Sequence, residues 1–321
     1  MTTSEPADRP GVVREGLLAR HPLLFFVLIA YLGTWVVWLP FLLSADGLGL
    51  MVFSNPLPLI VIGGLGTFTG PALGAFVMTG IIEGRVGIRR LVRKIVLWRV
   101  GVRWYLLTFL GFPVILTLAT IVVPGNLASF EPMDPLPLLG SFLIFFVYPA
   151  LIIGGPLGEE PGWRGFALPR LQRQHGPLVG SLILGVIWTF WHVAPVWLGA
   201  WLHAGMLNVY NFVLYLLFIT SWTIVMTWVY NNTKGSVFMA ILGHASVDAF
   251  PNGILWPLLP ASLAVTGYGV YFGYYGMVIG MGVLALVVIA LTRGQLGYQH
   301  YRQEEDEEVV VEEPDSVTAT A

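Results

Sequence analysis

The chain has 321 residues, of which 16 are basic and 18 acidic, and 56% are hydrophobic. Charged residues make up 11%, whereas soluble globular domains carry about 25%, so the composition excludes a disordered protein and an ordinary soluble enzyme. A formal net charge of −2 provides no basic footprint for nucleic acid. Because the sequence contains no cysteine, it also excludes disulfides, a thiolate nucleophile and cysteine ligands for a metal.

Eight apolar runs have the length of a membrane-spanning helix. About 20 apolar residues cross the hydrocarbon core, and backbone groups in lipid must pair within the helix. The first run is too long for the core of a signal peptide, so we expect no cleavable leader. The sequence therefore predicts an all-α, polytopic membrane bundle of about eight transmembrane helices. The runs lie at about 22–44, 57–82, 104–123, 137–157, 178–198, 206–230, 235–255 and 267–291.

The basic residues predict the orientation of this bundle. If the N-terminus is cytoplasmic, all 16 lysines and arginines fall on the cytoplasmic side, as the positive-inside bias requires. We therefore expect a protein integral to the cell membrane, with both termini in the cytoplasm. Between the second and third runs, Arg85, Arg89 and Arg93 recur every four residues opposite an apolar face. This pattern predicts a basic amphipathic helix on the cytoplasmic leaflet, either a topology anchor or a docking element for lipid or substrate.

Three parts of the chain are expected to differ in character. Residues 1–20 form a cytoplasmic N-terminal tail, residues 21–296 an integral membrane domain, and residues 297–321 an acidic, disordered cytoplasmic tail. Within the membrane domain, glycines recur every four residues, which predicts close helix packing inside the chain. These are Gly66, Gly70 and Gly74 in one run and Gly276 and Gly280 in another.

A few ionisable residues lie in or beside the apolar runs, where each costs roughly 2.5–3.5 kcal/mol on insertion scales. Carboxylates and imidazoles perform acid–base chemistry near neutral pH, so these residues are candidates for a reactive site. Each also has a structural alternative, as an ion pair at a helix end, a hydrogen-bonded core histidine or a pair that holds two helices together. The candidates are Glu159, Glu160 and Arg164, then His192 with Trp188 one turn before it, then His244 and Asp248.

The order and spacing of these residues resemble those of a known family. Residues 159–164 have the form E-E-x-x-x-R, residues 188–192 resemble F-x-x-x-H with tryptophan in place of phenylalanine, and residues 244–248 have the form H-x-x-x-N/D. This is similar to the CPBP family of CAAX proteases and bacteriocin-processing or immunity proteins, also called the Abi family, over a core of about 140–250. The resemblance implies an intramembrane endopeptidase with Glu159 as catalytic glutamate, completed by His192, His244 and Asp248 and supported by Glu160 and Arg164.

The resemblance leaves the cofactor open between Zn²⁺ and no metal. Without metal, Glu159 and His192 would deprotonate a water, His244 would stabilise the oxyanion, and Asp248 would orient His244. With zinc, Glu159, His192 and His244 would supply three ligands and leave a position for water. Chelators followed by metal analysis would distinguish the two.

The expected partners are membrane lipids and a peptide or lipidated protein substrate, without nucleic acid, while the oligomeric state stays open. The substrate is either a prenylated protein or a small hydrophobic peptide. Two other functions remain: a non-catalytic bacteriocin-immunity or membrane scaffold protein, and a proton-coupled transporter. Counting residues places Glu159 near the cytoplasmic edge but His192 about 20 Å deep and His244 about 12 Å deep. These three residues can meet in one site only if the fourth helix is tilted or continues through Glu159.

Overall fold

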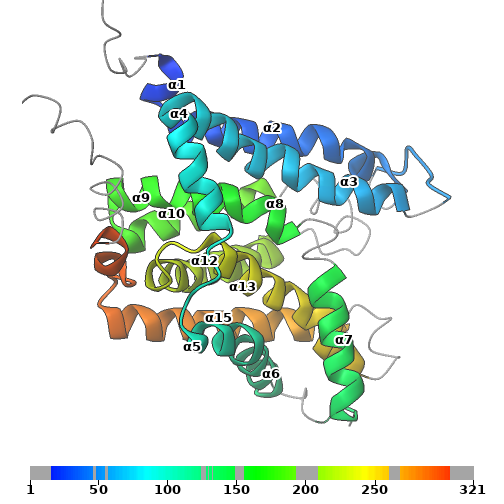
Figure 1. The fold of residues 1–321 in the computed structure, drawn as a ribbon. Helices are drawn as coiled ribbons and strands as arrows, with labels where there is room; N and C mark the ends of the chain where they lie inside the picture. The colour runs from blue at the N-terminus through cyan, green and yellow to red at the C-terminus, as the bar shows by residue number, and fades with distance from the viewer. Residues whose placement is uncertain are drawn as a thin grey trace, which may run out of the picture.

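A computed structural model describes residues 16–45, 48–54, 57–123, 128, 130–131, 133–148, 155–192, 209–259 and 268–303, with the side chains of 57–60 and 268–274 left aside. Within these ranges the chain is helical and contains no β-strand (Figure 1). The predicted all-α class is therefore confirmed.

Among the described residues, five stretches are long and apolar enough to cross a membrane: Pro22–Leu43, Val61–Ile95, Val102–Ile121, Val209–Asn232 and Tyr275–Thr292. They make the protein a polytopic membrane bundle, as predicted. Several of their helices run roughly alongside one another across Figure 1. The helices within the five stretches are α2 (Pro22–Leu43), α3 (Leu57–Thr67), α4 (Leu73–Ile95), α5 (Val102–Leu106), α6 (Phe112–Ile121), α12 (Val209–Asn232) and α15 (Tyr268–Thr292). Short π-helical segments join α3 to α4 (η1, Phe68–Ala72) and α5 to α6 (η2, Leu107–Gly111).

Shorter apolar helices complete the bundle. They are α7 (Pro135–Val147), α10 (Pro177–Trp191) and α13 (Val237–Phe250), the last extended by η7 (Pro251–Leu255) and η8 (Trp256–Leu258). The first described element is a single turn, α1 (Leu17–Arg20). Ser236 starts α13 by accepting a hydrogen bond from the amide of Met239, 3.0 Å away, and so caps one free N–H of the first turn. Almost every residue of α13 is buried, so this helix lies in the middle of the protein.

The structure corrects the fourth predicted span. Helix α7 ends at Val147, and α8 (Gly155–Gly162), η5 (Trp163–Ala167) and α9 (Leu168–His175) follow one another without a break in a different direction. The charged stretch predicted as a cytoplasmic loop is thus a helix about 30 Å long at 1.5 Å per residue. Its charged residues and three prolines hide it from hydropathy, but the structure buries most of these residues against partners. Glu159 lies near the N-terminal end of this helix, which continues through it, as one of the two expected arrangements requires.

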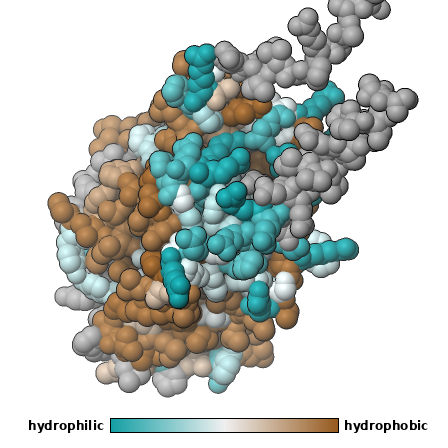
Figure 2. Space-filling model, turned by 90° about the vertical axis from the view of Figure 1, so that its left-hand side faces the viewer, coloured by the Kyte–Doolittle hydropathy of each residue, from teal (hydrophilic) through white to brown (hydrophobic). Residues whose placement is uncertain are grey.

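Helix α4 changes direction at Gly84. This residue has φ 64° and ψ −151°, a conformation that residues with a Cβ rarely adopt. Beyond the kink, a basic helix over residues 85–95 runs across the end of the bundle at the left of Figure 1, as the arginine spacing predicts. Figure 2 shows that end face-on: hydrophilic residues gather across it, and hydrophobic residues form its flanks. The cytoplasmic position of this face stays a prediction.

The glycine motifs pack helices of the same chain against one another. A Cβ on Gly70 would lie 2.0 Å from Oγ1 of Thr34 in α2, and one on Gly276 would lie 2.0 Å from Oγ1 of Thr120 in α6. The prediction of intramolecular packing is therefore confirmed. Near the C-terminus, residues 298–303 are helical, and Tyr301 is 1% exposed. The predicted N-terminal tail up to residue 15, and the acidic residues after 303, lie outside the described residues.

Candidate active site

Helix α8 carries both candidate glutamates and packs closely against η1. A Cβ on Gly158 would lie 2.2 Å from Oγ1 of Thr67, and one on Gly162 would lie 2.6 Å from Cβ of Pro71. These two glycines form a small-x-x-x-small motif of the kind that lets membrane helices approach. Their four-residue spacing is present in the sequence, but this helix contact was not predicted from it. The close approach leaves Glu159 and Glu160 to face helices α10 and α13.

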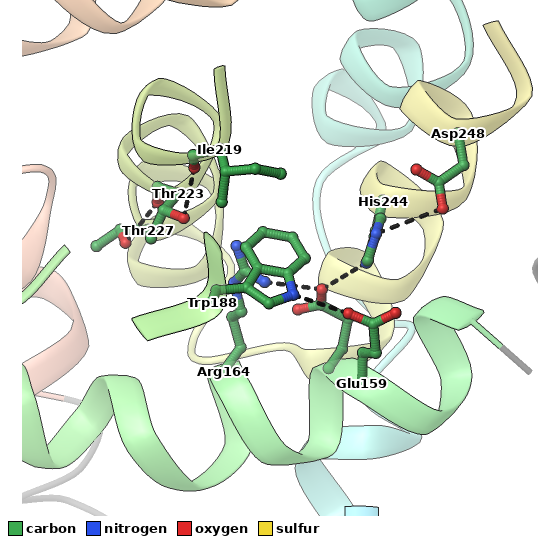
Figure 3. Close-up of polar contacts among 9 residues, drawn as sticks. Glu159, Arg164, Trp188, Ile219, Thr223, Thr227, His244 and Asp248 are labelled. Carbon is green, nitrogen blue, oxygen red and sulfur yellow. Dashed lines mark hydrogen bonds and ion pairs between the residues drawn. The ribbon is translucent and has the colours of Figure 1, made fainter. Parts of the chain in front are cut away.

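A buried chain of ionic contacts joins η5, α8 and α13. Oε1 of Glu160 accepts a hydrogen bond from Nη1 of Arg164 at 2.8 Å and lies 2.7 Å from Nδ1 of His244 (Figure 3). Glu160 and Arg164 are both fully buried. The ion pair expected from their spacing is thus present, and it also holds a histidine from another helix. Because a buried charge is stable only with such partners, this chain fixes the position of His244.

His244 lies between two carboxylates. Its Nδ1 faces Glu160, while its Nε2 is 3.4 Å from Oδ2 of Asp248, one helical turn away. The second distance is an ion-pair contact that is long for a hydrogen bond. The side chain of Asp248 is 46% exposed, so it can reorient, whereas Glu160 cannot. Two flanking carboxylates favour the imidazolium form, in which both nitrogens donate.

Trp188 connects Glu159 to this chain of buried contacts. Its Nε1 donates a hydrogen bond of 2.8 Å to Oε2 of Glu159, and its ring meets that of His244 edge-on at 5.1 Å. The guanidinium of Arg164 lies 4.3 Å from the centre of the indole, a cation–π contact. Trp188 stands where the family pattern has phenylalanine, and it makes a hydrogen bond that phenylalanine could not make. Within the part of the chain that the structure describes, Oε1 of Glu159 makes no hydrogen bond.

His192 lies on the other side of Trp188. Its Nδ1 is 2.8 Å from the carbonyl oxygen of Trp188, and its ring contacts those of Trp188 at 5.9 Å and Tyr215 at 5.6 Å. If Nδ1 donates to this carbonyl, Nε2 is left as an acceptor. His192 therefore borders the site but makes no direct hydrogen bond to Glu159. Tyr215, on α12, was not expected at the site, and no sequence signal marks it.

The geometry does not assemble the predicted zinc ligands. Among the described residues, no group of three or more histidine, aspartate or glutamate side chains is placed to hold a metal ion. Both nitrogens of His244 already face carboxylates, and His192 is turned toward a backbone carbonyl. The side chains present thus suit acid–base chemistry, and no step is derived through a metal.

Comparisons with known proteins agree with the motif order. The family described as type II CAAX prenyl endopeptidase Rce1-like matches residues 141–250. A curated relative, CAAX prenyl protease 2 of Methanococcus maripaludis, is 26% identical over 92 residues, which are 28% of this chain and 34% of the relative. The chain therefore matches about a third of that relative's length. The matched region contains α8, α10 and α13, so the resemblance to the CPBP family is confirmed where the site residues lie.

Proposed function

We propose that this chain is a membrane endopeptidase of the CAAX-protease type, in which Glu159 is the base that activates water. The arrangement of Glu159 supports this role. One of its oxygens is held by Trp188, and the other is available to accept a proton. A carboxylate within reach of water in a site sheltered from bulk solvent is a suitable general base. Glu160 is unsuited to that role because it is fully buried and its carboxylate is the countercharge of both Arg164 and His244.

The remaining residues have distinct roles in this mechanism. Water bound to Oε1 of Glu159 attacks the scissile carbonyl as its proton passes to the carboxylate. Glu160 holds the ring of His244 through Nδ1, and Asp248 orients it through Nε2 before substrate binds. When the exposed Asp248 side chain turns toward solvent, the Nε2–H donates to the oxyanion. Collapse of the intermediate breaks the C–N bond, and protonated Glu159 returns its proton to the leaving amine. His192 borders the site on the side of Trp188 away from Glu159 and presents its Nε2 as an acceptor nitrogen.

The proposed substrate is a peptide with a prenylated cysteine near its C-terminus. The name of the archaeal relative supports this choice, as does the position of the site among membrane helices. A small hydrophobic peptide is the second substrate to test. The proposed setting is the cell membrane, with the hydrophilic face of Figure 2 toward the cytoplasm.

The test uses the purified full chain in lipid vesicles. Three fluorogenic peptides are compared: a farnesylated CAAX peptide, the same peptide without the lipid, and an apolar peptide without cysteine. We expect cleavage of the farnesylated peptide, and a loss of about 100- to 10,000-fold in Glu159→Gln, because general-base catalysis contributes that much. Glu131→Gln, which changes an exposed glutamate, is the matched control. Full activity in Glu159→Gln would refute the assignment of the base. If folded wild-type protein cleaves none of the peptides, the scaffold alternative is favoured.

A further inference from the structure

A pocket lies on the hydrophilic face, away from Glu159 and Glu160. It has a volume of about 410 Å³ and lies between the basic part of α4 and the segment formed by η5 and α9. This volume is within the range of small-ligand sites. Its lining carries four basic side chains and one carboxylate: Arg90 and Lys94 from α4, Arg170 and Arg173 from α9, and Glu83.

The fold holds two of these basic groups in place. Lys94 is 7% exposed, and its Nζ is 3.1 Å from the hydroxyl of Tyr301. The side chain of Arg170 is 14% exposed, is paired with Glu83, and lies over the ring of Phe166 at 3.7 Å. Ordered cations at a fixed spacing distinguish this pocket from a set of mobile surface lysines. Arginine forks are suited to phosphate oxygens, which they can bind in pairs.

The residues around the pocket indicate its depth in the membrane. On the same helix, Val86 is 50% and Val92 43% exposed, and just beyond it Trp98 is 57% exposed. The guanidinium of Arg99 lies 5.2 Å from the centre of the Trp98 ring. Exposed valines next to a tryptophan and arginines are typical of a helix that lies at the level of the lipid headgroups. The pocket is therefore at the height where lipid phosphates are found.

We propose that this pocket binds the phosphate of an anionic phospholipid. Basic pockets between membrane helices are established sites for such headgroups. The pocket is separate from the candidate active site: Gly165 lines it, while the preceding residue, Arg164, points to Glu160 on the other side of η5. The proposal therefore holds whether or not the chain is a protease.

The test measures lipid binding to the purified full chain in detergent by native mass spectrometry and by the shift in melting temperature. Phosphatidylglycerol, phosphatidylcholine and inorganic phosphate are added separately. We expect phosphatidylglycerol to bind and stabilise the protein. Arg90→Gln combined with Arg173→Gln should weaken this binding roughly thirtyfold, about fivefold for each charge removed. Arg89→Gln combined with Arg93→Gln is the matched control, because it removes two exposed arginines of α4 that do not line the pocket.

The outcomes separate the possible ligands. A similar loss in the two double variants would refute the pocket and leave only attraction to a basic surface. Equal stabilisation by inorganic phosphate would confirm an anion site but assign it to a soluble phosphate. The acidic residues after Gln303 are a competing occupant. If a variant ending at Gln303 binds phosphatidylglycerol through Arg90 and Arg173 while the full chain does not, the tail fills the pocket and the lipid proposal is wrong.

Discussion

The hydrogen bond from Trp188 to Glu159 can be tested by replacing Trp188 with phenylalanine. This change removes the indole N–H that lies 2.8 Å from Oε2 and keeps an aromatic ring against His244. A hydrogen bond to a charged group contributes about 1.5–3 kcal/mol, and each 1.36 kcal/mol corresponds to tenfold in rate. We therefore expect kcat to fall about 10- to 100-fold, with little change in KM, because the proposed base is no longer held toward the substrate.

Trp222→Phe provides the matched control. Trp222 is 1% exposed, as Trp188 is, but its indole nitrogen has no hydrogen-bond partner, and its ring packs against Phe112. Both substitutions remove the same atoms from a buried site, so the loss of packing should be similar. We expect a lower melting temperature for Trp188→Phe than for Trp222→Phe, because only Trp188→Phe removes a buried hydrogen bond, and a fall in kcat only for Trp188→Phe. Equal kcat values in the two variants, measured on the farnesylated peptide in vesicles, would show that the hydrogen bond does not position Glu159.

Two further predictions concern stability. Glu160→Gln leaves the fully buried guanidinium of Arg164 without its countercharge and should lower the free energy of unfolding by about 3–5 kcal/mol, whereas Glu131→Gln should change it by less than about 0.5 kcal/mol. Chemical denaturation in detergent measures both, and equal values would contradict the buried pair. Gly162→Ala adds a Cβ 2.6 Å from Pro71, while Gly140→Ala meets nothing within 4 Å. We expect only Gly162→Ala to lower stability, by about 1–3 kcal/mol, and thermal melts that do not differ would argue against this helix contact.

Much of the architecture was predictable from local sequence. Long apolar runs such as 22–44 predict α2, and the four-residue spacing of arginines predicts the basic helix after Gly84, because each pattern reports directly on the surroundings of one helix. The motif residues were predictable for a different reason: ionisable groups are rare in such a sequence, so each one stands out.

The course of residues 155–175 could not be found in this way. Hydropathy assigns each charge an average cost of burial. Arg164, however, is buried with Glu160 on its own helix, and Glu160 also contacts His244, which lies 84 residues further along the chain. Pairing over such a separation depends on how the helices come together, which no local window contains. The same limit applies to Tyr215 beside His192, since only the packing of α12 on α10 brings the two rings together.

The dependence of this helix on α13 bears on how the protein is synthesised. When residues 155–175 leave the ribosome, the chain segment that supplies His244 has not yet been made, and isolated charges enter lipid at a high cost. Glu160 and Arg164 can pair within this helix at once, but Glu160 contacts His244 only after α13 emerges. A nascent chain cut short before α13 would therefore lack the third member of this buried chain of contacts.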